Sequence, residues 1–381
     1  MSIDFPENAR LIGRVWRPEL EGPSVVIVRD GVLFDVTREV ATVADFLDGD
    51  SVATYDSLKG DRLGPVDDFL ASPAEMGNGA TRACLLAPCD LQALKACGVT
   101  FARSMIERVI DERTAGDPAR AEAIRTRIGD LIGGSLTNVR AGSEASDHVR
   151  GVLQREGLWS QYLEVGIGPD AEVFTKSQPM SAVGHGALVG VNKISNWNNP
   201  EPEIVLAVNA RGEIRGATLG NDVNLRDVEG RSALLLGKAK DNNASCAIGP
   251  FIRLFDEGFS IADIEKAELS MSVRGTDGFE LSGRSNMAEI SRAPAELVRQ
   301  TLSSHQYPDG FMLFLGTMFA PTQDRGTPGS GFTHHEGDVV EIATPLLGTL
   351  SNTVTSCEKA APWTFGARAL MRNLVKRGVL A

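Results

Sequence analysis

The sequence contains, at residues 198–203, the run Asn198-Asn199-Pro200-Glu201-Pro202-Glu203 and, at residues 220–223, the run Gly220-Asn221-Asp222-Val223. Glu201 and Glu203 are two positions apart at the start of an apolar run. Alternate side chains of a strand point to the same face, so the two carboxylates face the same way. Two carboxylates that lie so close repel each other unless a positive charge sits between them.

A hairpin brings the second run beside the first. Residues 202–208 and 213–219 are β-like and flank the turn Ala210-Arg211-Gly212. If the hairpin turns about Arg211, the numbers of paired residues sum to about 422, which places Asp222 beside Glu201. Three converging carboxylates make an oxygen-rich site suited to Mg²⁺ or Mn²⁺. The sequence therefore predicts a metal site made of Glu201, Glu203 and Asp222.

An E-x-E pair by itself is common on solvated strand faces and has no function there. The apolar surroundings argue against that interpretation here: Ile204, Leu206 and Val208 follow directly, and Leu234–Leu236 comes soon after Asp222. Acidic residues at the edge of a buried sheet are rarely left unpaired.

Other catalytic motifs are absent or incomplete. The segment from Gly230 to Lys238 has the wrong glycine spacing for a phosphate loop, and Ala239 stands where a Ser or Thr is required. No G-x-S-x-G nucleophile elbow is present. His334-His335 lacks the spacing of a zinc site and is interpreted as a pair of loop residues.

The order of the motifs resembles that of the fumarylacetoacetate hydrolase superfamily over residues 160–355. E-x-E is followed by a run of the N-D-V-x-x-R-D type and then by further matching segments: Asn221-Asp222-Val223-Asn224-Leu225-Arg226-Asp227, Gly237-Lys238-Ala239-Lys240-Asp241, Ile248-Gly249-Pro250, Ser291-Arg292, Leu297-Val298, Gly316-Thr317, Gly337-Asp338-Val339-Val340 and Gly348-Thr349-Leu350-Ser351-Asn352. The resemblance implies a mixed β-roll that carries a divalent metal and forms a homodimer or a dimer of dimers.

Two segments are similar to the family's sugar-acid dehydratases of the 2-keto-3-deoxy-D-arabinonate and D-xylonate type. These are the Lys238-to-Pro250 segment with Asn242-Asn243 and Cys246, and Met318-Phe319-Ala320-Pro321 after Gly316-Thr317. The resemblance implies acid–base roles for Glu172 and Lys238, with either one as the base. It implies Mg²⁺, replaceable by Mn²⁺ or Ca²⁺. The expected substrate-binding residues are Lys176, Arg226, Asn242, Thr317 and Thr349.

The expected reaction is dehydration of a 2-keto-3-deoxypentonate to 2,5-dioxopentanoate. The metal would polarise the 2-oxo group as a Lewis acid, which makes a C3 proton removable. Arg226 either grips the substrate or orders Asp227. An alternative is a hydrolase that cleaves a C–C bond of a 2,4-diketo acid or acylpyruvate, with Glu144 and His148 at i,i+4 as a water-activating pair. A second alternative is a metal-dependent sugar-acid sensor or assembly subunit without catalysis.

Charge and cysteine content restrict the partners and the compartment. The net charge is −12 and no basic run is present, which argues against nucleic acid and anionic membranes as partners. An acidic protein with an anionic substrate needs a local positive centre, which a bound cation supplies. The five cysteines include no C-x-x-C pair, and neither a signal peptide nor a membrane span is visible. We expect a cytosolic protein that binds a small 2-oxo sugar acid.

The predicted fold is α+β in three parts. Residues 1–98 are expected to form a small β-rich domain with a hairpin at Asp30-Gly31 and a helix near Val40–Leu47. Residues 99–157 are expected to form a helical connector with helices over 101–132 and 143–156. Residues 158–381 are expected to form the metal-binding β-roll, closed by a helix at about 364–377.

Overall fold

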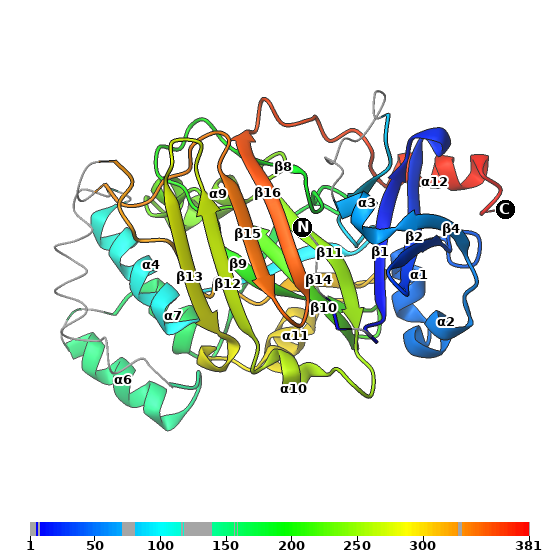
Figure 1. Ribbon diagram of the computed structural model, residues 1–381. Helices are drawn as coiled ribbons and strands as arrows, with labels where there is room; N and C mark the ends of the chain where they lie inside the picture. Colours follow the sequence, from blue (N-terminus) through cyan, green and yellow to red (C-terminus); the bar gives the residue numbers. More distant parts are fainter. Residues whose placement is uncertain are drawn as a thin grey trace.

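The computed structural model describes residues 5–6, 8–70, 81–115, 117, 139–155, 157, 159–326 and 330–380. Within them the strands form two mostly antiparallel sheets, with helices around their edges and faces (Figure 1). The larger sheet contains, in spatial order, β4 (Asp61–Pro65), β3 (Val32–Asp35), β2 (Gly22–Arg29), β1 (Leu11–Arg17), β11 (Cys246–Leu254), β10 (Ile214–Asp222), β9 (Pro202–Val208), β14 (Phe311–Phe314), β6 (Ala93–Gly98) and β7 (Glu172–Ser177), with β5 (Cys84–Leu86) paired to β1.

The smaller sheet lies over one face of the larger one. Its strands are, in order, β13 (Glu280–Asn286), β12 (Glu268–Arg274), β15 (Val339–Thr344), β16 (Gly348–Ser356) and β8 (Leu188–Val191). The α-helices are α1 (Val43–Asp48), α2 (Ser51–Ser57), α3 (Val66–Leu70), α4 (Ala102–Thr114), α6 (Glu144–Arg155), α7 (Gln161–Ile167), α8 (Arg226–Glu229), α9 (Leu236–Lys240), α10 (Ile261–Ile264), α11 (Pro294–Leu302) and α12 (Ala367–Lys376). Short 3₁₀ turns are η1 (Pro18–Leu20), η3 (Ala233–Leu235) and η4 (Met287–Glu289).

Strand β9 is buried along its whole length because both faces of the larger sheet are covered. Ile204 and Leu206 belong to a core that includes Leu269 of the smaller sheet. Val205, on the opposite face, belongs to a second core that includes Phe46 of α1. A strand that is covered on both sides reads as a continuous apolar run rather than as an alternation. This explains the sequence Ile-Val-Leu-Ala-Val that follows the two glutamates.

Most of the predicted local elements are present. The hairpin of β2 and β3 turns at Asp30 and Gly31, which both have positive φ, at 49° and 70°. Helices α1, α4, α6 and α12 lie where the sequence predicts helix. The part of the expected 101–132 helical region at residue 116 and at 118–132 lies outside the described residues.

Hydrogen bonding in the larger sheet crosses the predicted domain boundaries. β1 pairs with β11 (Figure 1). β6 lies between β14 and β7. The strands of residues 1–98 and of 158–381 therefore continue one sheet, and the division at 98 and 157 stays a prediction. Among the helices of the described residues, none is long and apolar enough to cross a membrane.

Candidate metal centre and acid–base site

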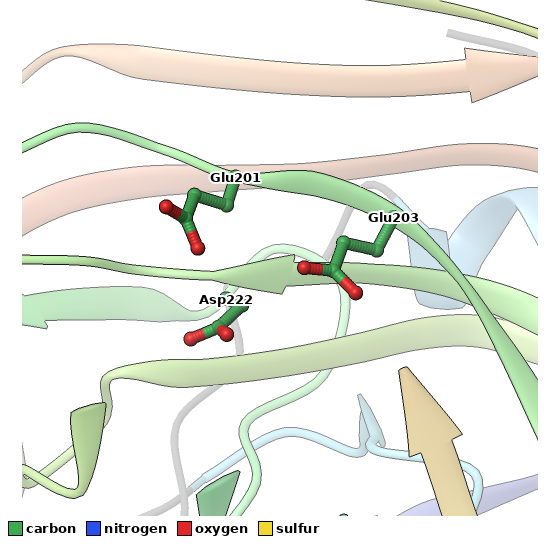
Figure 2. Close-up of side chains that lie close together, drawn as sticks. All are labelled: Glu201, Glu203 and Asp222. Carbon is green, nitrogen blue, oxygen red and sulfur yellow. The ribbon is translucent and has the colours of Figure 1, made fainter. Parts of the chain in front are cut away.

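Three carboxylates lie together at the end of the β9–β10 hairpin. Glu201, Glu203 and Asp222 are each 1% exposed, and one oxygen of each lies within 4.8 Å of the others. Figure 2 shows the three carboxyl groups turned toward one another from two neighbouring strands. No other described residues form a comparable group of His, Cys, Asp or Glu.

The register of the hairpin produces this convergence. Asn221 pairs with Pro202 and Gly220 with Glu203, so the paired numbers sum to 423 near the site. The backbone amide of Asp222 donates to the Glu201 carbonyl at 3.0 Å. A register shift between Ile214 and Gly216 separates this end of the hairpin from its turn. A β-bulge adds one residue on one strand, which accounts for the difference from the expected sum of about 422.

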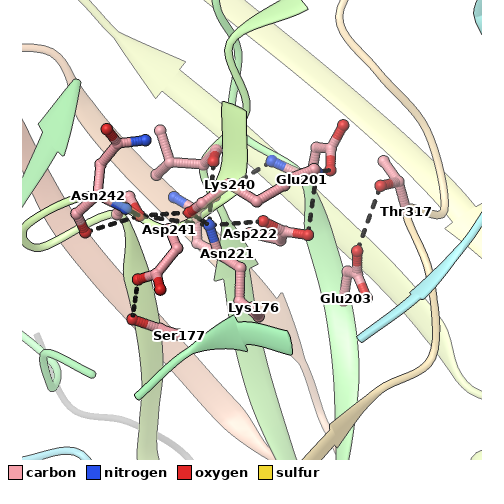
Figure 3. A network of polar contacts seen from close by, with 12 residues as sticks. Lys176, Ser177, Glu201, Glu203, Asn221, Asp222, Lys240, Asp241, Asn242 and Thr317 are labelled. Atoms are coloured by element: carbon pink, nitrogen blue, oxygen red, sulfur yellow. Dashed lines mark hydrogen bonds and ion pairs between the residues drawn. The ribbon is translucent and has the colours of Figure 1, made fainter. Parts of the chain in front are cut away.

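Two lysines form ion pairs with the carboxylates. Lys240, on α9, donates to Glu201 Oε2 and lies 3.0 Å from Asp222 Oδ2 (Figure 3). Lys176, on β7, is fully buried and lies 2.8 Å from Asp222 Oδ1. Its ammonium also donates to the backbone carbonyls of Lys240 and of Val223, the latter at 3.2 Å. Lys176 therefore ties a carboxylate of the cluster to the chain segment that carries Lys240.

A third cation comes from a remote part of the sequence. Arg108, on α4, donates to Glu201 Oε1 and lies 3.4 Å from Glu229 Oε2. Glu203 is held differently, because it accepts hydrogen bonds from the Gly316 amide at 2.7 Å and from the Thr317 hydroxyl at 3.2 Å. Glu201 thus contacts two cations, whereas Glu203 contacts neutral donors.

The pKa values of the carboxyl groups reflect this difference. Burial and the charges of Asp222 and Glu201 raise the pKa of Glu203 well above its usual value. Burial would also raise the pKa of Glu201, but Lys240 and Arg108 outweigh it and lower the pKa to about 2. Burial alone would lower the pKa of Lys240, yet Asp222 and Glu201 outweigh it and raise that pKa. The Lys240 ammonium is therefore held in its charged form.

Glu172 lies at the edge of the same cluster. Burial and the charge of Glu229 raise its pKa to about 7, although Arg108 and Lys240 act in the opposite direction. Gly98 is its partner in the β6–β7 pairing, and a Cβ at Gly98 would overlap the Glu172 carboxyl group. The glycine therefore leaves the space that the carboxyl group occupies. A carboxyl with a pKa near neutrality can accept or donate a proton during catalysis.

The comparisons with known proteins agree with this geometry. The model of the fumarylacetoacetate hydrolase C-terminal domain matches residues 167–355. A probable 2-keto-3-deoxyxylonate dehydratase of Haloferax volcanii is 30% identical over 269 residues, which cover 65% of this chain and 89% of that protein. The chain belongs to the fumarylacetoacetate hydrolase family.

A second relative agrees with this family membership, and a solved structure shares the fold. The 2-dehydro-3-deoxy-D-arabinonate dehydratase of Saccharolobus solfataricus is 30% identical over 188 residues, which cover 49% of this chain and 60% of that enzyme. A structure of 2-keto-3-deoxy-D-arabinonate dehydratase complexed with magnesium and 2,5-dioxopentanoate aligns with a TM-score of 0.63 at 20% identity, covering 91% of this chain and 99% of that one. The predicted family is confirmed, and so is the expectation of an enzyme, since the curated relatives are named dehydratases, which are hydro-lyases.

The structure places a different lysine beside the carboxylates from the one that the sequence suggested. Lys238 is exposed, whereas Lys240 is 3% exposed and contacts the cluster. Successive residues of a helix are rotated by about 100°, so side chains two positions apart on α9 point in nearly opposite directions. Of these two lysines, Lys240 is therefore the one that contacts the carboxylates.

The expected substrate-binding residues are placed in different surroundings. Lys176 and Thr317 contact the carboxylates. Arg226 is buried, ion-paired to Glu107 at 2.9 Å and stacked 4.2 Å from the centre of the Trp197 ring. These contacts show Arg226 held by α4 and Trp197.

Asn242 and Thr349 do not contact the carboxylate cluster. The Asn242 side chain accepts a hydrogen bond from Asn192 Nδ2 at 2.8 Å and donates one to the Lys238 carbonyl at 3.0 Å. Thr349 lines a separate cavity of about 800 Å³ on the smaller sheet, with His185 and Arg274 among its neighbours.

Two further residue pairs considered in the sequence are Glu144 with His148, the candidates for a hydrolase, and His334 with His335. Glu144 and His148 are both exposed on α6, which lies at the periphery of the molecule (Figure 1). His334 and His335 lie in a loop, as the sequence predicted, and His334 is buried with its Nδ1 3.2 Å from Asp338 Oδ2. Its neighbour His335 is half-exposed and lies 3.3 Å from Asp277.

Sequence reasoning missed the contribution of α4. Glu107 and Arg108 are consecutive on this helix, and they reach Arg226 and Glu201 respectively. Charged residues on a helix usually lie on its solvated face, so the sequence alone carried no sign that this pair is buried. Residues 99–157 were expected only to connect two domains, yet α4 covers one side of the site.

The cluster fits a hard divalent cation. It offers only carboxylate oxygens from the protein, and Mg²⁺ takes such ligands together with water and substrate. Burial and the charges of Asp222 and Glu201 raise the pKa of Glu203, so a further positive charge there would favour its ionised form. A cation among the three carboxylates would supply that charge.

Proposed function

We propose that this protein is a Mg²⁺-dependent dehydratase that converts a 2-keto-3-deoxypentonate of the D-arabinonate or D-xylonate type to 2,5-dioxopentanoate. The observation that carries the proposal is that Lys240 contacts the buried carboxylate cluster, while Glu172 interacts electrostatically with Lys240 and Glu201. A charged ammonium and a carboxyl with a pKa of about 7 form an acid–base pair beside a site for a hard metal. The names of the curated relatives support the same reaction.

In this proposal Glu201, Glu203 and Asp222 hold the cation. When bound there, Mg²⁺ supplies a Lewis acid that polarises the 2-oxo group of the substrate and makes its C3 proton acidic. Lys176 keeps Asp222 in position, and the Gly316 amide and Thr317 hydroxyl orient Glu203. Mn²⁺ and Ca²⁺ are expected to be accepted in place of Mg²⁺, because both favour oxygen ligands.

The proposal assigns the two proton transfers to Glu172 and Lys240. Glu172, as a carboxylate, removes the C3 proton, and the electron pair forms the C3–C4 double bond. Lys240 donates its proton to the C4 hydroxyl, which leaves as water. A C5 proton then moves to C3, which leaves an enol with a C4–C5 double bond, and transfer of the enol's hydroxyl proton to C4 gives the C5 aldehyde of 2,5-dioxopentanoate. General acid–base catalysis of this kind contributes about 10²–10⁴-fold to a rate.

The test is product analysis with a panel of substrates. Purified protein with Mg²⁺ is incubated with 2-keto-3-deoxy-D-arabinonate, 2-keto-3-deoxy-D-xylonate and two acylpyruvates. We expect one five-carbon dicarbonyl product from a pentonate and no pyruvate from the acylpyruvates. Pyruvate release without conversion of either pentonate would instead assign the C–C bond hydrolase, for which Glu144 and His148 were the sequence candidates. No turnover of any member would favour the sensor or assembly subunit.

The assembly and the compartment form part of the proposal. We expect a homodimer or a dimer of dimers in the cytosol, as the family resemblance and the free cysteines suggest. Four of the five cysteines are buried, which suits a reducing compartment. Sedimentation analysis of the purified protein measures the assembly, and a monomer at micromolar concentration would contradict this expectation.

A further inference from the structure

Two asparagines lie one step beyond the metal-binding pair on the same hairpin. Asn199 and Asn224 form a reciprocal backbone pair, with hydrogen bonds of 3.1 and 3.0 Å. Their numbers sum to 423, as do those of Glu201 and Asp222, so the register is continuous. Strand residues two apart point to the same face. Asn199 and Asn224 therefore lie on the face of the hairpin that carries the carboxylates.

Both amide groups are buried and incompletely hydrogen-bonded. Each residue is 0% exposed. Asn199 Nδ2 donates to the Pro200 carbonyl at 2.8 Å, but Asn199 Oδ1 and both amide atoms of Asn224 have no hydrogen-bond partner among the described protein atoms. Buried polar atoms without partners are rare in native proteins, and each calls for a partner such as a water, an ion or a ligand. Here three such atoms belong to residues that lie two positions along the chain from the proposed metal ligands Glu201 and Asp222.

The chemistry of these atoms identifies the kind of group that they bind. The pair offers two acceptor oxygens and one donor nitrogen, all neutral. A carboxylate only accepts hydrogen bonds and an ammonium only donates them, so neither would satisfy both kinds of atom. A hydroxyl group does both. Two strand residues span about 6.8 Å, which suits the tail of a small acid whose head is held at the metal.

We propose that Asn199 and Asn224 form a hydroxyl-binding subsite that selects 2-oxo acids with a hydroxyl group at C5. This inference rests on the proposed function and specifies its substrate class. In that reaction the C4 hydroxyl leaves and must face Lys240, whereas the C5 hydroxyl stays on the substrate throughout. A fixed pair of amides farther from the metal fits the hydroxyl that is retained.

The test compares two ligands that differ by one oxygen. Binding of 2-oxopentanoate and of 5-hydroxy-2-oxopentanoate to the full chain in saturating Mg²⁺ is measured by titration calorimetry. Neither ligand has a C4 hydroxyl, so neither can be dehydrated. We expect the wild type to bind the hydroxylated ligand at least about tenfold more tightly, since sites built to bond a hydroxyl reject analogues that lack it. Equal affinities in the wild type would overturn the proposal.

Variants locate the effect. Asn224→Leu, of similar size, is expected to lose the preference while its affinity for 2-oxopentanoate stays unchanged. Asn196→Ala, at an exposed position in the same segment, is the matched control and keeps the preference. A variant that weakens both ligands alike would assign a purely structural role and overturn the subsite. If Asn224→Leu does not fold, the proposal is tested by the ligand preference of Asn199→Leu and of the wild type.

The outcome can be separated from that of the proposed function. A hydroxyl preference without turnover of the pentonates would keep the subsite and reject the dehydratase. Turnover of the pentonates without a hydroxyl preference would keep the dehydratase and reject the subsite.

Discussion

The ammonium group of Lys240 lies 3.0 Å from Asp222 Oδ2, and the same group donates to Glu201. Because Asp222 and Glu201 are carried by neighbouring strands, Lys240 bridges the two sides of the hairpin at the site. The backbone carbonyl of Lys240 in turn accepts from Lys176, which pairs with Asp222. The proposed proton donor and the proposed metal ligands are therefore held by one network.

The first prediction separates the two lysines of α9. Lys240→Met is expected to lower kcat by at least about a hundredfold, because it removes a proton-transfer group. The affinity for Mg²⁺ should stay the same or rise, since a positive charge next to Glu201 and Asp222 is lost. Steady-state kinetics and metal titration measure the two effects.

Lys238→Met is the matched control, because Lys238 is exposed on the same short helix. It should retain nearly full activity. A large loss in Lys238→Met together with a mild effect of Lys240→Met would restore the role that the sequence first suggested.

The second prediction concerns the pH dependence of the reaction. The pKa of Glu172 is raised to about 7, so this carboxyl is protonated below that pH and ionised above it. As the base it is active only when ionised, and kcat should therefore fall as the pH drops through about 7. In Glu172→Gln the fall in kcat toward acid pH should be absent, and kcat should be at least about a hundredfold lower than in the wild type. A profile in which activity is lost above pH 7 would assign Glu172 as the acid.

The third prediction concerns metal binding and stability. Mg²⁺ at 100 times its Kd should raise the free energy of unfolding by about 2.7 kcal/mol, because it binds only the folded chain. Glu203→Gln should abolish the increase in Tm on adding Mg²⁺. Without metal this variant should be at least as stable as the wild type at neutral pH, since the raised pKa of Glu203 means that its charge is disfavoured.

Glu213→Gln is the matched control, because Glu213 is an exposed carboxylate at the other end of the same hairpin. It should respond to Mg²⁺ like the wild type. An unchanged metal response in Glu203→Gln would exclude this residue as a ligand. Thermal unfolding with and without chelator measures the metal response of both variants.

The fourth prediction concerns acid stability. Burial lowers the pKa of His334 below its usual 6.5, although Asp338 acts in the opposite direction. The unfolded chain therefore binds a proton at this histidine at a higher pH than the folded chain does. Its contribution to stability is complete above about pH 6.5 and is lost as the pH falls below it, by up to about 1.4 kcal/mol per pH unit.

Urea unfolding of wild type and His334→Asn between pH 5 and 8 measures this contribution. The wild type should lose stability toward acid more steeply than the variant. His305→Asn, at an exposed histidine, is the control and should follow the wild type. Parallel curves for the wild type and His334→Asn would show that His334 does not titrate differently on folding.

Local signals in the sequence predicted the parts of the site that lie on one hairpin. A turn at Arg211 and alternation along two strands are short-range properties, so the approach of Asp222 to Glu201 followed from residue spacing. The same reasoning identified the β2–β3 turn and helices α1, α4, α6 and α12. The residue numbers paired near the site sum to 423, whereas spacing alone gave about 422. The difference comes from a bulge between Ile214 and Gly216, which depends on packing rather than on turn chemistry.

The sequence by itself determined the family and the three carboxylates, because these depend on ordered motifs and on spacing within a strand pair. Only the tertiary structure decided which lysine reaches the cluster, since α9 rotates Lys238 and Lys240 to opposite sides. It also decided that Arg108 pairs with Glu201, a contact between residues 93 positions apart. Contacts between distant segments arise from the packing of whole elements against the sheet, and no local pattern in the sequence encodes them.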